Sequence, residues 1–181
     1  MRGSDVIVRT GLLLFLILAA ITDCRRRKVY NTQVFAGIFA GILYFAAVGY
    51  GKGGNFLTAV LEVAGFLARL SAVCILFFPL FACRMIGAGD IKLMGICVGA
   101  LGIWDGIFAV FAGLLLAAAA SAWKMYKDGS FRERLCFLGR FAARAGREHR
   151  LSVYREWNYR RDIIPLGPFL AAGYSIYLLF S

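Results

Sequence analysis

The sequence contains five cysteines but no Cys-x-x-Cys pair, and proline is scarce, with 3 residues. Three of the cysteines lie within apolar stretches, so we interpret them as small buried apolar residues. This excludes a disulfide framework and a zinc site, and we expect neither a metal nor another cofactor. The cysteines are Cys24, Cys74, Cys83, Cys97 and Cys136.

Acidic residues are also few. The chain has 10 Asp and Glu against 21 Lys and Arg, which leaves a formal net charge of +11. Such an excess could indicate nucleic-acid binding, but the basic residues are concentrated in two segments that directly adjoin apolar blocks. Contact with anionic membrane lipids explains this pattern more simply, and we expect no nucleic-acid partner.

Apolar residues, by contrast, are abundant. They make up 61% of the chain, above the roughly 45–50% of soluble domains. They occur in blocks separated by charge clusters, as expected when each block crosses a hydrocarbon layer of about 30 Å as a helix. We therefore predict an all-α polytopic membrane bundle of about six transmembrane helices, with residues 1–181 forming a single domain. The candidate spans are 6–22, 33–50, 56–82, 91–103, 105–122 and 163–180.

The distribution of Lys and Arg predicts the orientation, because cytoplasmic loops retain positive charge. The connections after the first, third and fifth spans carry Arg25–Lys28, Arg84 and a basic loop at about 123–162, so they should share one side. The opposite connections contain only Lys52 and a tight turn from Gly102 to Asp105. We expect the basic connections in the cytoplasm and both termini outside.

The N-terminal region allows a second interpretation. Arg2 and Arg9 run against an external N-terminus, and with the apolar run Gly11–Ala20 they also fit a cleavable signal peptide. The basic stretch Arg25–Lys28 follows directly and favours a retained membrane helix. Cys24 does not indicate a lipoprotein, because Asp23 precedes it where a small residue is expected.

The basic loop at about 123–162 has arginines at positions 140, 144, 147 and 150. This spacing predicts a basic stripe along one helical face. A helix that lies on anionic lipid is the simpler interpretation. A docking surface for an acidic partner is the alternative.

The ten acidic residues can be sorted by position, because ionisable groups beside membrane spans are costly and usually functional. Seven of them lie in polar segments, in a turn or beside arginines. Glu62 has Arg69 seven residues later, on the same helical face, as a ready partner. Asp23 and Asp90 remain as candidate functional residues.

Asp23 ends the first span and Asp90 begins the fourth, and the predicted topology brings both to the cytoplasmic boundary. Two carboxylates in one site cannot both ionise easily, so one retains a proton. The charged one can take a proton from water while the protonated one polarises a peptide carbonyl, which is aspartic-protease chemistry without a metal. Alternatively, each aspartate pairs with a nearby basic residue such as Arg25 or Lys92.

Three motifs resemble one family. Gly87–Leu93 places Asp90 on a backbone where glycines permit unusual dihedrals and close substrate approach, and it resembles the Gly-x-Gly-Asp-x-Lys-Leu motif of the type IV prepilin peptidases. These are intramembrane aspartic proteases of the same broad type as presenilin. Asp23, with Asn31 eight residues later, resembles the first-aspartate motif of the family. Ile164–Ala171 is similar to the stretch that opens its last helix.

This resemblance covers nearly the whole chain. It implies that Asp23 and Asp90 are the catalytic pair, in a protein of the inner membrane whose active site faces the cytoplasm. The implied substrate is a pilin-like precursor whose basic leader is removed after a glycine. Lys92 would bind an acidic residue early in the mature precursor; alternatively, its side chain extends to the lipid headgroups. The other active-site motif residues implied are Gly87, Gly89, Asn31, Pro165, Gly167 and Pro168.

The chain also departs from the family pattern. Val29-Tyr30-Asn31 replaces Ile-Pro-Asn and Leu166 replaces Phe, so the fine geometry of these turns can differ. An extra cytoplasmic segment with paired Cys-x-x-Cys, associated with N-methylation in many members, is missing. We therefore expect a peptidase without methyltransferase activity. The alternatives are a catalytically silent pilus-assembly scaffold subunit and a small transporter that uses Asp90 as an ion site.

Overall fold

The computed structural model describes residues 3–26, 30–53, 55–83, 86–127, 129, 136 and 165–180. The elements in this part of the chain are all helices, which confirms the predicted all-α class. The basic loop predicted at about 123–162, with its arginine stripe, falls almost entirely outside the described residues. The helices are α1 (Gly3–Arg26), α2 (Asn31–Gly53), α3 (Phe56–Ala82), α4 (Ala88–Leu101), α5 (Ile103–Lys127) and α7 (Gly167–Phe180).

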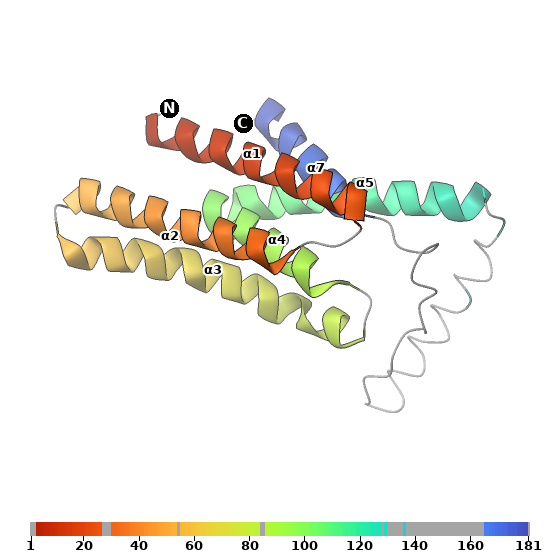
Figure 1. The fold of residues 1–181 in the computed structure, drawn as a ribbon, viewed down its shortest axis with the longest axis horizontal. Helices are drawn as coiled ribbons and strands as arrows, with labels where there is room; N and C mark the ends of the chain where they lie inside the picture. The colour runs from red at the N-terminus through yellow and green to blue at the C-terminus, as the bar shows by residue number, and fades with distance from the viewer. Residues whose placement is uncertain are drawn as a thin grey trace.

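The helices run roughly along the long axis of the molecule (Figure 1). The last turns of α1 and α3 and the first turns of α2, α4 and α7 gather at one end, whereas both chain termini lie towards the other. We call the first of these the Asp23 end, since Asp23 lies in the last turn of α1. Segments far apart in the sequence therefore meet there.

Four of the helices are long and apolar enough to cross a membrane: α1, α2, α3 and α5. The other two, α4 and α7, have 14 residues each and are about 21 Å long at 1.5 Å per residue, short of a layer of about 30 Å. The prediction of about six spanning helices is thus corrected: the described residues form six helices, of which four have full spanning length. Ile103, assigned to the fourth span, begins α5, and the predicted Gly102 to Asp105 turn is reduced to Gly102.

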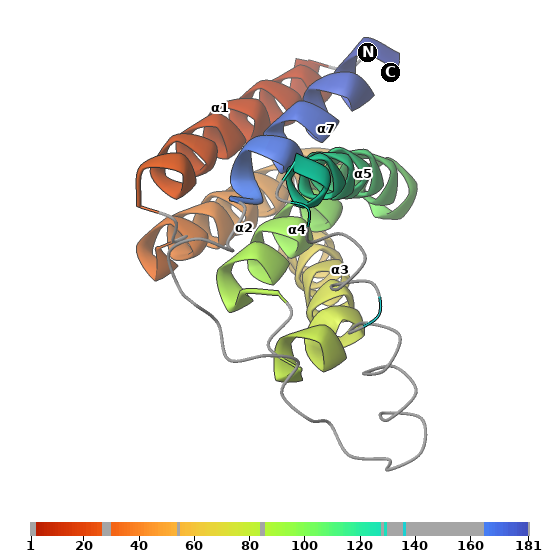
Figure 2. The same ribbon diagram turned by 90° about the vertical axis from the view of Figure 1, so that its right-hand side faces the viewer.

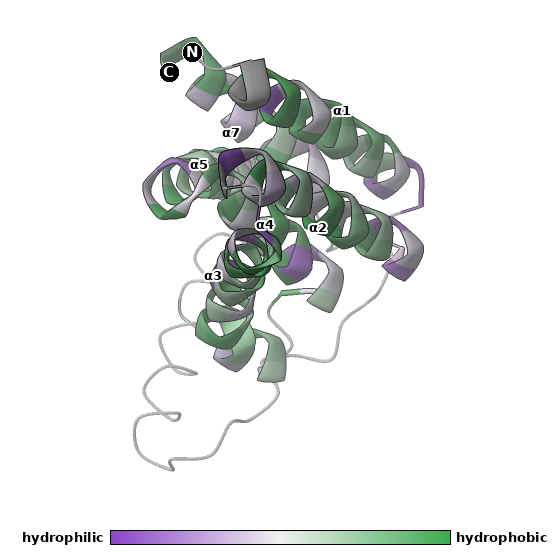
Figure 3. Ribbon diagram, turned by 90° about the vertical axis from the view of Figure 1, so that its left-hand side faces the viewer, coloured by the Kyte–Doolittle hydropathy of each residue, from purple (hydrophilic) through white to green (hydrophobic). Residues whose placement is uncertain are grey.

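The surface of the long helices is apolar. Figure 3 shows hydrophobic residues along most of their length, with hydrophilic residues mainly near the helix ends. Such faces are stable in contact with lipid and would be costly in water. Exposed large side chains include Leu14, Leu18, Phe35, Phe39, Leu61, Leu76, Phe108 and Phe111.

Helix α4 lies in the middle of the bundle, between α2, α3 and α5, when the Asp23 end faces the viewer (Figure 2). Nearly all of it from Ile91 to Gly99 is buried. It ends at Gly102, whose φ of 95° is open mainly to glycine and whose N–H donates to the Val98 carbonyl. This single-residue turn lets α5 fold back directly along α4.

Close helix contacts depend on glycine, as expected where lipid removes most of the hydrophobic driving force between helices. Gly113 of α5 faces Gly173 of α7, and neither has room for a Cβ atom. The fully buried Phe66 of α3 fills the space beside Gly41 and Gly99. These contacts hold α2 and α4 close to α3, and α5 close to α7.

Two arginines have partners that the sequence pattern did not indicate. Glu62 forms an ion pair of 2.7 Å with Lys52, so the predicted pairing of Glu62 with Arg69 is wrong. Arg69 instead donates to the backbone carbonyl of Gly99. Arg9, which runs against the orientation rule, lies 5.5 Å from the centre of the Tyr177 ring, a cation–π contact between α1 and α7.

Candidate active site

Asp23 lies in the last turn of α1 and is only 4% exposed. Its Oδ2 accepts a hydrogen bond of 2.8 Å from the backbone N–H of Gly167, which is 144 residues away in sequence. Gly167 is the first residue of α7, so its N–H has no partner within that helix. The bond therefore ties the end of α1 to the start of α7.

This arrangement places a buried acid where a helix can stabilise its charge. A carboxylate at the C-terminal end of α1 is unfavourable beside that helix, but the positive N-terminal end of α7 offsets this effect. The approach requires glycine, because a Cβ atom on Gly167 would lie 3.1 Å from Asp23 Oδ2 and 3.2 Å from the Ala20 Cα. The contact is thus specific to a glycine at position 167.

Asp90 is the third residue of α4, whose N-cap is Gly87. Its carboxyl reaches back to hydrogen-bond the backbone N–H of Gly87, as an acid at the third position of a helix commonly does. Gly87 has an ordinary extended backbone with φ of −72°, so the unusual dihedrals that its glycine permits are not used here. Its small size matters instead, since a Cβ atom would lie 3.0 Å from Asp90 Oδ2.

The two carboxyls interact electrostatically. Asp90 is partly exposed and directly precedes the apolar stretch of α4 that begins at Ile91. Burial, followed by the charge of Asp23, raises the pKa of Asp90 to about 6, while the Gly87 N–H acts in the opposite direction. At a pH below about 6 Asp90 therefore retains a proton beside the Asp23 carboxyl.

The alternative prediction, that each aspartate pairs with a nearby basic residue, finds no support among the described residues. Neither Asp23 nor Asp90 forms an ion pair with a lysine or arginine of the described residues. Arg25 is exposed, and Lys92 lies two positions after Asp90, a spacing that places it on a different face of α4.

The remaining motif residues take different positions around the aspartates. Gly89 is half-buried in the first turn of α4. Asn31 is exposed at the first position of α2 and is not joined to either aspartate by a hydrogen bond within the described residues. Pro168 follows Gly167 in the first turn of α7, where its lack of an N–H is tolerated, and Pro165 lies just ahead.

Sequence reasoning missed a polar contact next to Asp23. Thr22 exchanges a side-chain hydrogen bond with Gln33 of α2, with oxygen–nitrogen distance 2.9 Å. Arg26 donates to the Tyr30 hydroxyl at 2.7 Å and also lies over its ring. These contacts join the end of α1 to the start of α2. A glutamine within the first turn of an otherwise apolar helix was the signal that could have indicated them.

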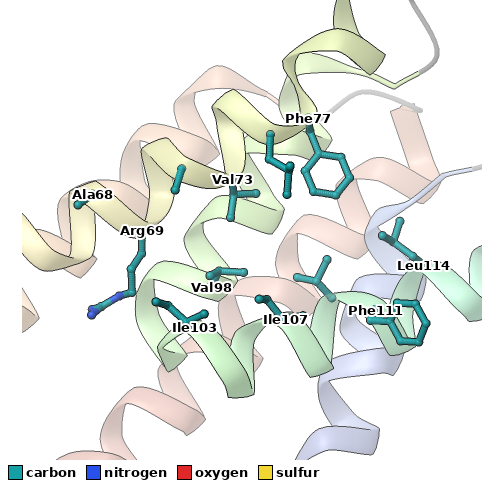
Figure 4. A pocket seen from close by; sticks show the side chains of 12 residues that line it. Ala68, Arg69, Val73, Phe77, Val98, Ile103, Ile107, Phe111 and Leu114 are labelled. Carbon is teal, nitrogen blue, oxygen red and sulfur yellow. The ribbon is translucent and has the colours of Figure 1, made fainter.

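An apolar cleft lies on another side of the bundle, between α3, α4 and α5 (Figure 4). Its volume is about 510 Å³, and neither aspartate lines it. The described residues contain no group of three or more His, Cys, Asp or Glu side chains placed to hold a metal ion. The candidate acid–base residues Asp23 and Asp90 thus lie apart from this cleft.

Comparison with known proteins identifies the family. A sequence model of the type IV leader peptidase family matches residues 10–122, more than half of the chain. The matched stretch includes both aspartates, while Gly167 and α7 lie beyond it. No match was found among curated proteins or among solved structures. The chain therefore belongs to the type IV leader peptidase family, which makes it a multi-pass membrane peptidase whose substrates are pilin-like precursors in general.

Proposed function

We propose that this protein is an aspartic endopeptidase that removes the basic leader of a pilin-like precursor, after a glycine, at the cytoplasmic face of the inner membrane. The observation that carries the proposal is the pair of interacting carboxyls, Asp23 and Asp90, which come from different helices and have no cation partner within the described residues. Family membership independently supports peptidase chemistry.

The two aspartates would have different roles. The Gly167 N–H occupies Asp23 Oδ2 as an acceptor, which leaves the other oxygen of this carboxylate free to take a proton from water. Asp90, with its raised pKa, donates its proton to the carbonyl oxygen of the scissile peptide as the water oxygen bonds to the carbonyl carbon.

The tetrahedral intermediate then breaks down with the proton movements completed. The proton on Asp23 passes to the leaving nitrogen as the C–N bond breaks, and the hydroxyl formed from the carbonyl returns its proton to Asp90. The products are the leader with a free carboxyl group and the mature chain with a free amine. Both aspartates end in their starting protonation states, and no cofactor is consumed.

The activity is proposed to stop at cleavage. The chain has no Cys-x-x-Cys pair of the kind that accompanies N-methylation in many relatives. The mature product should therefore carry an unmodified amino terminus, which mass spectrometry of the released chain would check. A product heavier by one methyl group would contradict this part of the proposal.

The test of the catalytic pair is co-expression with a candidate precursor. Asp23→Asn and Asp90→Asn should each stop conversion while expression and membrane insertion persist, because an amide preserves the size of the side chain. Wild-type activity should persist in a metal chelator. Robust conversion by either variant, or a loss on chelation that zinc reverses, would defeat the aspartic mechanism and favour a scaffold or metal-dependent role.

The orientation is a separate proposal. Arg25 and Arg26 are exposed at the Asp23 end, and Lys124 and Lys127 lie in the last turn of α5, in keeping with a cytoplasmic position for positively charged residues. A cysteine placed at Lys127, in a variant without the natural cysteines, should resist a membrane-impermeant thiol reagent in intact cells. Ready labelling at this position would contradict the proposed orientation.

A further inference from the structure

Arg69 lies in the middle of α3, 13 residues after Phe56 and 13 before Ala82, and is half-buried. A charged group at such depth is costly unless it has partners. Its Nε and Nη2 donate to the carbonyl oxygen of Gly99 at 3.2 and 3.0 Å. The guanidinium also lies 5.5 Å from the centre of the Phe45 ring. No ion pair with a described acidic residue accompanies these contacts.

The accepting carbonyl belongs to the last turn of α4, which ends at Leu101. Carbonyls in this turn lack partners within the helix and form the negative end of its dipole. Two N–H groups of one planar guanidinium reach the same oxygen, an arrangement that a lysine ammonium does not reproduce. Arg69 thus caps α4 from a neighbouring helix.

Elsewhere in the α3–α4 contact, glycines of α4 lie against large apolar side chains of α3. Gly95 of α4 lies against Leu70, and Gly99 lies against Phe66. These glycines permit close approach but contribute no polar side chain that would oppose sliding along the helix axis. The Arg69 bonds are the polar contact that opposes such sliding at this end of α4.

Asp90 lies on the same helix, nine residues before Gly99, or about 14 Å at 1.5 Å per residue. A short, nearly fully buried helix moves as one body, so an axial shift at Gly99 displaces the Asp90 carboxyl equally. We propose that Arg69 is a positioning residue, which holds α4 in the register that brings Asp90 to Asp23. This inference rests on the proposed catalytic role of Asp90.

A ligand-binding role for Arg69 is less well supported. In Figure 4 the aliphatic stem of Arg69 borders the apolar cleft, while its guanidinium points away from the cleft. An anionic group of a molecule in the cleft would therefore not meet the charge. The bonds to Gly99 and the Phe45 ring account for the direction of the side chain.

The experiment compares purified Arg69→Met, Arg69→Lys and Arg69→Gln with the wild type in detergent. The matched control is Lys52→Met. Arg69 contacts Phe45 of α2 as well as α4, and Lys52→Met removes another charged contact between α2 and α3 without affecting α4. Precursor cleavage is measured per amount of monodisperse protein, as kcat and KM separately and across pH. Asp90→Asn is measured in the same series.

We expect Arg69→Met to lower kcat by about tenfold or more, because reaction rates fall steeply when a catalytic group is displaced, with KM changed by less than about twofold. Arg69→Lys should lower kcat by a smaller factor, and Lys52→Met should have the kcat of the wild type. The pH at which activity is lost should also shift in Arg69→Met. A purely structural defect would lower the amount of folded protein without moving this pH.

Each outcome decides the inference. If Arg69→Met has the kcat and pH profile of the wild type, the positioning role is overturned. If Arg69→Met does not fold, a wild-type kcat and pH profile in both Arg69→Gln and Arg69→Lys would overturn it. If Asp90→Asn cleaves normally, the proposed catalytic pair itself fails. If Asp90→Asn is inactive while every folded Arg69 variant is fully active, only the positioning role fails.

Discussion

At one end of the bundle Glu62 meets Lys52 at 2.7 Å, with side chains 32% and 53% exposed. At the other end Asp23 is 4% exposed, and its hydrogen-bond partner is a backbone N–H. Asp90 lies within its electrostatic range and has no cation partner among the described residues. Glu62 is thus neutralised by an ion pair, whereas no cation of the described residues neutralises Asp23 or Asp90.

This difference distinguishes an acid with an ordinary ion-pair partner from the two acids proposed to catalyse cleavage. An exposed ion pair contributes about 0–1 kcal/mol and imposes little on its surroundings. Burial and the nearby charge of Asp23 disfavour the ionised form of Asp90, a cost that an exposed ion pair does not carry. The predictions below change one end or the other and compare the results.

The largest effect is expected from the aspartates together. Asp23→Asn and Asp90→Asn should each lower cleavage by about 1,000-fold or more, and the double variant should be scarcely worse, since residues that act as a unit are non-additive. Asp→Glu at either position should also be severely defective, because the carboxyl is displaced. Single-turnover cleavage of a precursor measures this. If the loss of cleavage in the double variant equals the product of the two single losses, the two aspartates act independently.

The next largest effect is expected from Gly167→Ala, which should lower the cleavage rate by about 10–100-fold. The new Cβ atom would lie 3.1 Å from Asp23 Oδ2 and 3.2 Å from Ala20 Cα, so Asp23 or the start of α7 must move. Gly51→Ala, where nothing lies within 4 Å, is the control. Unchanged cleavage by Gly167→Ala would show that the Gly167 contact is not needed for catalysis.

Cleavage should fall as pH rises through about 6. The raised pKa of Asp90 means that it is protonated below this value and ionised above it, so the acid form is lost at higher pH, by about tenfold per pH unit well above the pKa. A pH–rate profile under single-turnover conditions tests the sign. A rate that increases through pH 6 would assign the proton to another group.

Lys92→Gln should have a smaller effect, of about a few-fold, since this lysine lies on a different face of α4 from Asp90. If Lys92 binds an acidic residue of the precursor, the variant should slow cleavage of the natural precursor more than that of a precursor with this acid neutralised. Competition between the two precursors measures the ratio. Equal slowing of both would rule out the pairing.

The smallest effect is expected at the opposite end. Lys52→Met removes the ion pair with Glu62 and should change the free energy of unfolding by about 0–1 kcal/mol, with cleavage unaltered. Thermal unfolding in detergent and the same cleavage assay measure these quantities. A large loss of activity would mean that the two ends of the bundle are coupled more strongly than the Arg69 contact alone explains.

Some of these features could be read from the sequence. Blocks of apolar residues and the charges between them are local properties, and they were enough to predict a helical membrane protein. Sorting the acidic residues by position left Asp23 and Asp90, because a carboxylate beside an apolar block has few structural uses. Both steps depend only on residue type and on nearby residues along the chain.

Partner choice, by contrast, depended on the tertiary structure. Helical spacing placed Glu62 and Arg69 on one face, yet Glu62 pairs with Lys52 across the α2–α3 turn and Arg69 caps α4. The two short helices, α4 and α7, were likewise expected to span, because hydropathy reports apolar surface and not whether lipid or protein covers it. Only the packed bundle decided that the N–H of Gly167 meets Asp23, 144 residues away, since no local pattern encodes which helix ends come together.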